Sequence, residues 1–402
     1  MRAVFQTFKI FGLTITVAIW LIACSPFAAP RPTATREKSA RAVTLAPVTP
    51  TASPSPEPAF PFSFQVLDIA FIDPNQGWAL GTFGNGFTRG QIAMRVTVDG
   101  GKTWQSAPAP EIEMPPGDLP LRHLRFANAK DGWAFEPGFF STHDGGKTWG
   151  NENRQGKVIA IEPVGNSVWV VEQNCQKVEP YQCQFALLIW NPAQQIWAPA
   201  PGKLPAGIQK LFRVSATEAW LLSTEESYTP VYSRNRIFVT RDGGLTWAEP
   251  NPGITHTGCS HLAMDKGKQL WLFCGGGPAT MMQIKDIWLS RDEGKQWSKI
   301  ADAIPDSLGG GLNNLPIIGF MWDVAVVSKE RAFIALIHQS VIGTTDGGQT
   351  WNDVIDFFDG NAIGGFRRVI FVDELHGWAT PGQNLIFRTR DGGATWEQIE
   401  IP

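Results

Sequence analysis

Six aspartates at regular spacing are the first residues in this sequence that could carry chemistry. Neighbouring members stand 45 to 54 residues apart, except for one interval of 98 residues: Asp99, Asp144, Asp242, Asp292, Asp346 and Asp391. Carboxylates can act as acids or bind metals, but a metal requires ligands that converge within about 2.0 to 2.6 Å. One aspartate in each repeat does not converge in this way. We therefore expect no metal site, no cofactor and no catalytic acid among them.

Each aspartate belongs to a local pattern that suits a tight turn. A Ser or Thr stands two residues before it, glycine follows closely, and a tryptophan stands five residues after it. The carboxylate can accept backbone N–H bonds, and glycine tolerates a positive φ. The tryptophan can fill space between neighbouring sheets. We interpret these patterns as structural turns, which end at Trp104, Trp149, Trp247, Trp297, Trp351 and Trp396.

Two aromatic series set the number of repeats at seven. In the middle of the long interval, residues 190–197 keep the final tryptophan, Trp197, after losing the aspartate and the glycines. A second series, often within Gly-Trp-Ala, consists of Trp78, Trp133, Trp169, Trp220, Trp271, Phe333 and Trp378. Units of this length with four short strands are typical of propeller blades, which stack because one small sheet cannot bury both faces. We predict an all-β, seven-bladed propeller of four-stranded antiparallel blades over residues 62–402.

The repeats resemble two groups of known proteins. The turn pattern alone resembles the Asp-box (BNR) of the sialidase-like and sortilin-like propellers. The combination of Phe71-Ile72-Asp73, Gly77-Trp78-Ala79 and residues 97–104, repeated at 371–396, resembles the photosystem II stability and assembly factor family more closely. That resemblance implies a non-enzymatic, lumenal or lipid-anchored propeller that engages membrane-protein precursors through an arginine-rich patch.

The strand order separates the connections onto two faces. With strands A to D running outward from the axis, the A–B and C–D connections share one face, and the B–C and D–A connections share the other. The short turn patterns are C–D connections, so we expect their face to be a scaffold. The long connections lie on the opposite face: 82–90, 172–184, 223–234, 275–285, 106–120 and 303–319. Because function often resides on variable loops, we predict that a protein partner binds there; the alternative is tolerated insertions without a partner.

Basic residues in the predicted innermost strands form a second candidate binding site. They are Arg122, Arg125, Lys210, Arg213, Arg367 and Arg368. At the central channel they would create a positive field for an acidic peptide, a carboxylate or a membrane-protein terminus. The alternative is that they are solvated, or paired with Asp68 and Asp323.

A sialidase-type glycosidase or carbohydrate-binding propeller is the alternative function. Such an enzyme would need a tyrosine nucleophile with a glutamate partner. The only tyrosines are Tyr181, Tyr228 and Tyr232, and the last two stand near Glu225 and Glu226 in a segment that also suits a polar exposed loop. The Phe-Arg-Ile-Pro element that opens sialidase domains is absent. We therefore favour binding over catalysis.

The cysteines indicate an oxidising compartment. Apart from Cys24 they form two pairs, Cys175 with Cys183 and Cys259 with Cys274. A two-residue turn at Lys266-Gly267 would place Leu262 opposite Trp271 and the second pair of cysteines opposite each other. We predict two disulfides.

The N-terminus resembles that of a bacterial lipoprotein. Arg2 and Lys9 precede a short apolar segment from Ile10 to Ile22, and Leu21-Ile22-Ala23-Cys24 resembles a lipobox. We predict a signal peptide over 1–23 and lipidation of Cys24; an ordinary signal with an accidental cysteine is the alternative. Residues 24–61 form a linker rich in Pro, Ser and Thr. The expected location is the extracytoplasmic face of a membrane.

The overall charge disfavours one class of partner. The chain has 34 basic and 37 acidic residues, for a formal net charge of −3. A nucleic-acid-binding protein would show a strong basic excess. We expect a monomer that binds a protein and, through its lipid, a membrane, but no nucleic acid.

Overall fold

The computed structural model divides the chain into two units, residues 1–58 and 59–402. It describes the backbone of residues 8–10 and 13–15, and then residues 63–83, 91–112, 121–175, 183–224, 234–251, 258–276, 281–304, 311–355, 357 and 365–402. In the first unit, β1 (Phe8–Ile10) pairs with β2 (Leu13–Ile15). Over the described ranges, no helix has the length and apolar character needed to cross a membrane.

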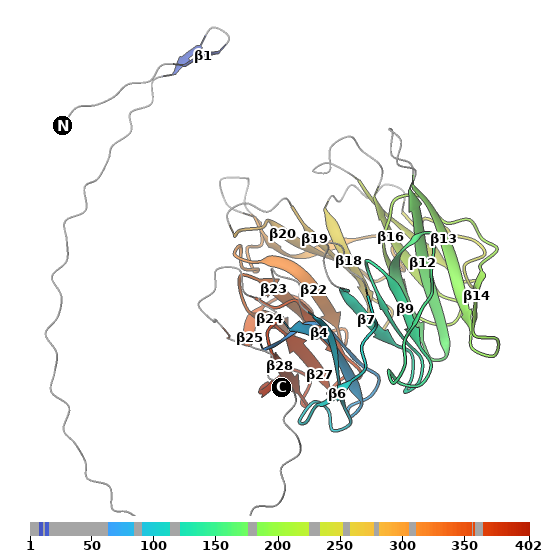
Figure 1. Ribbon diagram of the computed structural model, residues 1–402. Helices are drawn as coiled ribbons and strands as arrows, with labels where there is room; N and C mark the ends of the chain where they lie inside the picture. The colour runs from blue at the N-terminus through green and yellow to red at the C-terminus, as the bar shows by residue number, and fades with distance from the viewer. Residues whose placement is uncertain are drawn as a thin grey trace, which may run out of the picture. The chain divides into compact units, whose positions relative to one another are not determined.

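The second unit is an all-β propeller of seven sheets, as the repeats predict. Figure 1 shows the sheets following one another in chain order, with the blue β4 of the first blade beside the red β27 and β28 of the last. Within each sheet the strands pair antiparallel in sequence order. Every blade is therefore built from one continuous stretch of chain.

The first four blades contain these strands. Blade 1 has β3 (Phe64–Phe71), β4 (Gly77–Phe83), β5 (Gln91–Thr97) and β6 (Gln105–Ala107). Blade 2 has β7 (His123–Phe126), β8 (Gly132–Phe135), β9 (Phe139–Thr142) and β10 (Gly150–Asn151). Blade 3 has β11 (Lys157–Val164), β12 (Ser167–Cys175), β13 (Cys183–Asn191) and β14 (Ile196–Pro199). Blade 4 has β15 (Ile208–Arg213), β16 (Ala219–Thr224) and β17 (Asn235–Thr240).

The last three blades each have four strands. Blade 5 has β18 (Cys259–Met264), β19 (Leu270–Gly275), β20 (Lys285–Ser290) and β21 (Ser298–Ala303). Blade 6 has β22 (Phe320–Val326), β23 (Ala332–Ile337), β24 (Val341–Thr344) and β25 (Asn352–Ile355). Blade 7 has β26 (Arg368–Phe371), β27 (Gly377–Thr380), β28 (Leu385–Thr389) and β29 (Glu397–Glu400).

Blade 4 departs from the expected four strands. Its outermost strand is reduced to one bridge, in which Val239 and Ala248 exchange two backbone hydrogen bonds of 2.8 and 2.9 Å. Pro250 stands two residues after Ala248 and has no backbone N–H to donate, so it cannot extend this pairing.

The decayed repeat in blade 3 forms the predicted turn. Strands β13 and β14 pair on either side of it, with Trp190 opposite Trp197. Asn191 stands near the position of the missing aspartate, and its Oδ1 accepts the N–H of Ala193 at 3.1 Å. An amide oxygen therefore supplies part of what the carboxylate does in the other repeats.

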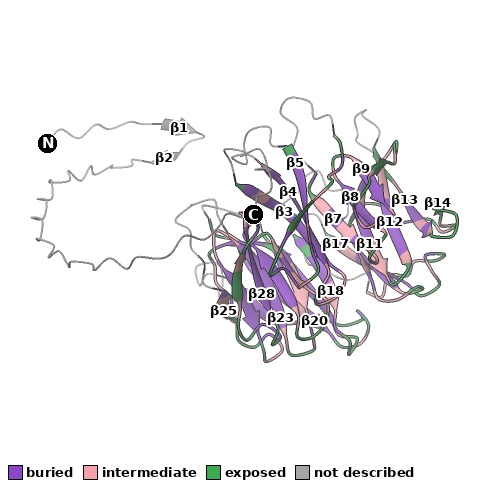
Figure 2. Ribbon diagram, turned by 60° about the horizontal axis from the view of Figure 1, so that its bottom comes forward, coloured by how far each residue is buried: buried purple, intermediate pink, exposed green. Residues whose placement is uncertain are grey.

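Aromatic residues hold neighbouring blades together, and the same contact closes the ring. Trp78 of blade 1 stacks on Phe126 of blade 2 with ring centroids 3.7 Å apart, and its Nε1–H donates to Gly145 O at 3.0 Å. Trp378 of blade 7 stacks on Phe71 of blade 1, also at 3.7 Å, and donates to Gly100 O at 3.0 Å. Figure 2 shows mostly buried residues along β3 and β4 of blade 1 and along β28 of blade 7. Blade 7 thus meets blade 1 as blade 1 meets blade 2.

Side-chain packing closes the ring without exchange of a strand. Phe64, Val66 and Ile69 of blade 1 share a buried cluster with Ile386 and Ile401 of blade 7. The C-terminal residues also contact blade 1, because Arg95 Nε donates to Pro402 O at 2.8 Å. Both termini of the propeller therefore contribute to one junction.

The hairpin between β18 and β19 corrects the predicted register. The turn is one residue longer than the predicted two-residue turn, so Leu262 pairs with Leu272 and not with Trp271. Lys268 joins the turn in the left-handed region, with φ of 64°. Asp265 Oδ1 accepts the N–H of Gln269 at 3.0 Å, which stabilises the longer turn.

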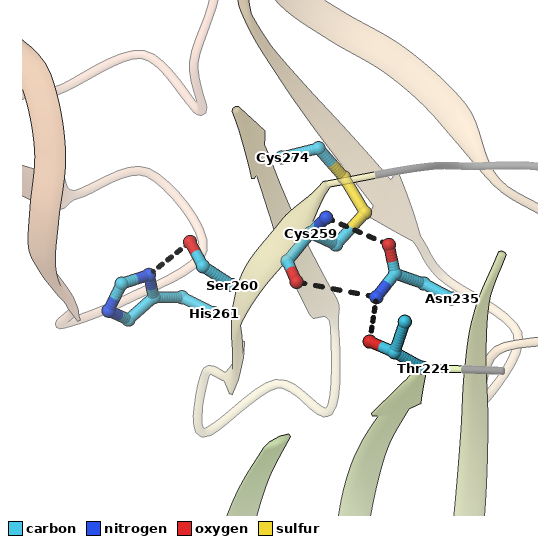
Figure 3. Close-up of a disulfide and its surroundings, with 6 residues drawn as sticks. All are labelled: Thr224, Asn235, Cys259, Ser260, His261 and Cys274. Carbon is cyan, nitrogen blue, oxygen red and sulfur yellow. Dashed lines mark hydrogen bonds between the residues drawn. A yellow bond between two sulfur atoms is a disulfide. The ribbon is translucent and has the colours of Figure 1, made fainter. Parts of the chain in front are cut away.

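A bulge restores the predicted cysteine pairing at the other end of this hairpin. The register shifts between Cys259 and His261, so that Cys259 again faces Cys274, and the two form a disulfide. Figure 3 shows Asn235 of β17 holding Cys259, whose N–H donates to Asn235 Oδ1 at 2.8 Å. The disulfide therefore lies where blade 4 meets blade 5.

The second predicted disulfide is also present. Cys175 and Cys183 are bonded and stand opposite each other at the ends of β12 and β13. Both strands extend into the segment predicted as a loop over 172–184, and the bond joins them where their pairing ends.

Candidate functional site

The aspartates of the repeats act within their own turns. The Thr148 hydroxyl donates to Asp144 Oδ2 at 2.7 Å, and the Thr148 N–H donates to Asp144 Oδ1 at 2.9 Å. The Thr142 hydroxyl donates to Asp144 and accepts the N–H of Gly146 at 2.8 Å. Equivalent bonds recur in the other five turns. These contacts identify the aspartates as parts of the scaffold.

The hydrogen bonds also keep these carboxylates ionised. The Thr148 hydroxyl is the main cause that lowers the pKa of Asp144 to about 2. At Asp242, the Thr246 hydroxyl has the same effect and lowers the pKa to about 2. A general acid needs a pKa near the working pH, so these groups are poorly suited to that role.

A ring of titratable side chains occurs at one level of the innermost strands. Each ring position is the residue of the innermost strand whose pairing partner stands two residues after the buried aromatic of strand B. The residues at these positions are Asp68, His123, Ala160, Lys210, His261, Asp323 and Arg368. Six of these seven positions carry an ionisable group. Six of the seven blades therefore place an ionisable residue at the same level of their innermost strand.

The centre of this ring is an ion network on Asp68. This carboxylate is 2% exposed and lies 2.9 Å from Arg125 Nη1 and 3.0 Å from Arg368 Nε. It also accepts the N–H of Leu124 at 2.9 Å. Burial would raise its pKa, but Arg368 and Arg125 outweigh that effect, and the pKa is lowered. The network joins blades 7, 1 and 2.

Asp323 extends the network to blade 6. Its Oδ2 lies 3.2 Å from Arg368 Nη1 and accepts the N–H of Val369 at 3.1 Å. Arg368 therefore lies between two carboxylates. The alternative expected from the sequence, that the basic residues pair with Asp68 and Asp323, holds for Arg125 and Arg368.

Burial shifts the pKa values of three further groups near this network: Glu162, Lys210 and His261. Burial raises the pKa of Glu162 and lowers that of Lys210. Burial and nearby Lys210 lower the pKa of His261 to about 4, so this imidazole is neutral at pH 7. The channel combines charges of both signs and is not a uniformly positive field.

The other predicted basic residues occupy two different environments. Arg213 is buried, where it donates to Ser167 O at 2.7 Å and lies over the ring of Trp169, so it supports the fold. Arg122 and Arg367 are exposed at equivalent places, each one residue before the ring position. Arg122 has a loose ion pair with Glu136 at 3.8 Å. No carboxylate among the described residues lies within ion-pair distance of Arg367.

The predicted binding site contained only arginines and lysines, so it did not include His123, Glu162 and His261. A sequence signal for most of the ring nevertheless exists. Counting back ten residues from the strand-B aromatic reaches the ring residue in six blades, and nine residues in blade 3. The significance of this ten-residue spacing can be recognised only once the pairing register is known.

Several predicted sites lie outside the described residues. These include the lipidation site Cys24, the tyrosines Tyr181, Tyr228 and Tyr232, and the glutamates Glu225 and Glu226. Their proposed roles stay predictions.

Comparison with known proteins supports the resemblance suggested by the repeats. Residues 311–402 match the family model described as photosynthesis system II assembly factor YCF48. The photosystem II stability/assembly factor HCF136, chloroplastic, of Arabidopsis thaliana is 23% identical over 337 residues, covering 80% of this chain and 75% of that protein. The chain is a propeller similar to photosystem II assembly factors. The same factor from Oryza sativa subsp. japonica is 24% identical and covers 80% of the chain and 78% of its own length.

Solved structures agree with this fold. The structure of YCF48 bound to D1 peptide aligns with a TM-score of 0.56 at 19% identity, covering 82% of this chain and 94% of that one. The β-propeller domain of the Trilobed protease from Pyrococcus furiosus, described as having an open velcro topology, aligns with a TM-score of 0.50 at 8% identity over 84% and 97% of the two chains. At such identities the likeness concerns the fold alone.

Proposed function

We propose that this assembly factor-like propeller is a non-enzymatic, exported lipoprotein that binds a segment of a membrane-complex subunit on its B–C and D–A face. Its sequence similarity to HCF136 over 80% of the chain is the observation that carries the proposal. A structural relative is bound to a D1 peptide. Lipid on Cys24 would hold the propeller at the membrane where such a subunit is assembled.

The exposed guanidiniums of Arg122 and Arg367 fit this function. Both directly precede ring residues, His123 and Arg368, whose side chains already lie against carboxylates. Guanidinium groups can bind a carboxylate through two parallel N–H bonds. An acidic side chain or terminus of the partner is the matching group.

Binding of a fluorescent D1 peptide to the purified full-length chain tests the proposal. We expect anisotropy to report saturable binding that weakens about tenfold in Arg122→Ala/Arg367→Ala, a loss of about 1.4 kcal/mol. Arg291→Ala/Arg390→Ala is the matched control, because these two exposed arginines lie in C–D turns on the opposite face. Equal weakening in both variants would remove the assignment to this face, and no saturable binding would remove the D1 assignment.

A sialidase-type activity is the competing function. We expect no turnover of fluorogenic sialosides or β-glycosides by the full-length chain. Turnover that disappears in Tyr228→Phe would replace the binding proposal with a glycosidase.

A further inference from the structure

Two long connections of blades 5 and 6 fold together on the B–C and D–A face. Met282 and Ile318 form an antiparallel bridge. Beside it, the Gln283 N–H donates to Ile317 O at 3.0 Å, and the Gly319 N–H donates to Met281 O at 2.9 Å. Residues 281–284 and 317–319 thus form a short two-stranded ribbon, called the rim ribbon below.

A buried lysine fixes the rim ribbon to the blade. Lys285 is fully buried, and its ammonium nitrogen lies within hydrogen-bond distance of four backbone carbonyl oxygens, which share its three N–H donors: Gln283 at 3.0 Å, Ile317 at 3.1 Å, Ile318 at 3.3 Å and Gly319 at 2.7 Å. The Met321 N–H also donates to Gln283 Oε1 at 2.9 Å, which ties the ribbon to β22. Because these polar groups are satisfied locally, the ribbon is an ordered part of the rim.

The rim ribbon holds large apolar side chains in solvent. Ten large hydrophobic residues of the described chain are exposed, and five of them lie on the ribbon or beside it: Met281, Met282, Ile284, Ile318 and Trp322, each 37% to 54% exposed. Such a concentration is unusual for a surface that contacts only water. Methionine and tryptophan are also enriched at protein interfaces.

An exposed arginine, Arg367, precedes the inner strand of the blade next to that of Trp322. Trp322 directly precedes Asp323, whose carboxylate contacts Arg368 and the N–H of Val369 on the neighbouring strand. Arg367, exposed and outside ion-pair distance of any described carboxylate, directly precedes Arg368. Trp322 and Arg367 therefore occupy adjacent blades at the same level of the channel mouth.

We propose that the rim ribbon and Arg367 together dock a partner-protein segment that carries large apolar side chains beside a carboxylate. The inference rests on the proposed function, because it assumes a polypeptide ligand on this face. The exposed Arg367, in the blade next to the apolar patch, favours an acidic neighbour in the ligand by charge complementarity. The formal net charge of −3 disfavours docking to an anionic membrane surface, which requires clustered basic residues.

Two short fluorescent peptides test the docking site on the purified full-length chain. One contains two leucines and a phenylalanine beside two glutamates, and the other replaces the apolar residues with serine. We expect the apolar peptide to bind, and Trp322→Ser/Met282→Ser to weaken it at least about tenfold. Val98→Ser/Leu375→Ser is the matched control, because these residues are 70% and 49% exposed in turns on the opposite face, and it should bind normally.

A second variant tests whether the ordered backbone of the rim ribbon matters for binding, without removing its exposed apolar side chains. Lys285→Met keeps an apolar stem but removes the donors to four carbonyls, so we expect faster hydrogen exchange at residues 281–284 and weaker peptide binding. Unchanged exchange would show that the lysine does not hold the ribbon. Whatever the exchange result, unchanged peptide binding by Trp322→Ser/Met282→Ser would overturn the docking site itself.

The outcomes also distinguish this inference from the proposed function. If the D1 peptide binds through Arg122 and Arg367 while both rim variants bind the apolar peptide like the unaltered chain, the docking inference fails and the proposed function stands. If the apolar peptide binds at the rim but the D1 peptide does not bind, the docking inference stands without D1. Association of the chain with itself, lost in Trp322→Ser/Met282→Ser, would identify a second copy as the occupant. Binding of the chain to anionic vesicles but to neither peptide would identify a lipid surface.

Discussion

At the residue scale, the repeated aspartates show why regular spacing alone does not identify a catalytic site. The carboxylate of Asp144 receives the hydroxyl and N–H of Thr148, so its hydrogen-bonding capacity is used within one turn. The same carboxylate type at Asp68 binds two arginines from different blades. Environment, not residue type, separates a turn residue from a channel residue.

Acid should weaken the Asp-box turns over a defined pH range. The native pKa of Asp144 is about 2, whereas an unfolded aspartate titrates near about 3.9. Its stabilising effect is therefore complete above pH about 4 and is lost as the pH falls through about 2. Carboxyl-resolved NMR titration should give the low native value, and Thr148→Val should raise it. A wild-type value equal to that of the urea-unfolded chain would contradict this account.

The ion network should make Asp68 important for stability. Asp68→Asn leaves Arg125 and Arg368 close together without their shared carboxylate, and removing one partner of a buried pair costs about 3 kcal/mol. Urea unfolding followed by tryptophan fluorescence measures the change. As a control, Glu374→Gln removes an exposed ion pair with Lys266, and it should cost less than about 1 kcal/mol. Equal costs for the two variants would show that the network contributes no more than a surface pair.

At the element scale, most of the architecture follows from local sequence chemistry. Two aromatic series and the turn pattern are sufficient to predict seven blades, because each blade must bury equivalent aromatic residues against its neighbours. Pairing register is harder to predict. One extra turn residue, Lys268, shifts the blade 5 hairpin, and a bulge before His261 shifts it back. Such compensating irregularities arise from competition between turn geometry and core packing, which a residue pattern does not reveal.

The contacts on the proposed binding face were predictable only in part, because they join segments that lie far apart in the sequence. Long connections indicate the B–C and D–A face, but the pairing of Met282 with Ile318 joins segments of two different connections. Likewise, basic residues in inner strands point to the channel. Their division into paired Arg125, structural Arg213 and exposed Arg367 depends on contacts between blades.

The disulfide between β18 and β19 should stabilise the junction of blades 4 and 5. Its cysteines are 15 residues apart, and closing a loop of that size in the unfolded chain is worth about 3 kcal/mol in the chain-entropy model. We expect Cys259→Ala/Cys274→Ala to lower the free energy of unfolding by about that amount in urea. The Cys175→Ala/Cys183→Ala pair is the comparison, with a separation of 8 residues and a slightly smaller effect. A stability unchanged in both pairs would show that neither bond contributes.

At the scale of the whole molecule, the ring is closed by packing between blades 7 and 1. The stacking of Trp378 on Phe71 reproduces the stacking of Trp78 on Phe126. The last junction therefore uses the same chemistry as the first, even though its two blades come from opposite ends of the propeller sequence. Residues near the C-terminus, including buried Ile401, belong to this junction.

Ile401 should accordingly behave as a core residue despite its place near the chain end. Ile401→Ala removes a fully buried side chain and should destabilise the propeller by about 3 kcal/mol. The control Ile196→Ala changes a half-exposed isoleucine on the outer strand of blade 3 and should stay within about 0.5 kcal/mol. Urea unfolding compares them, and a negligible cost at Ile401 would mean that the ring does not depend on this end.

Hydrogen–deuterium exchange of the full-length chain, with and without excess D1 peptide, tests the central claim most directly. A propeller that binds protein through its B–C and D–A face predicts slower exchange at 281–284, 317–322 and 365–368, with the Asp-box turns such as 97–104 unchanged. Protection confined to the Asp-box turns, or no change anywhere with the peptide in excess, would contradict the account.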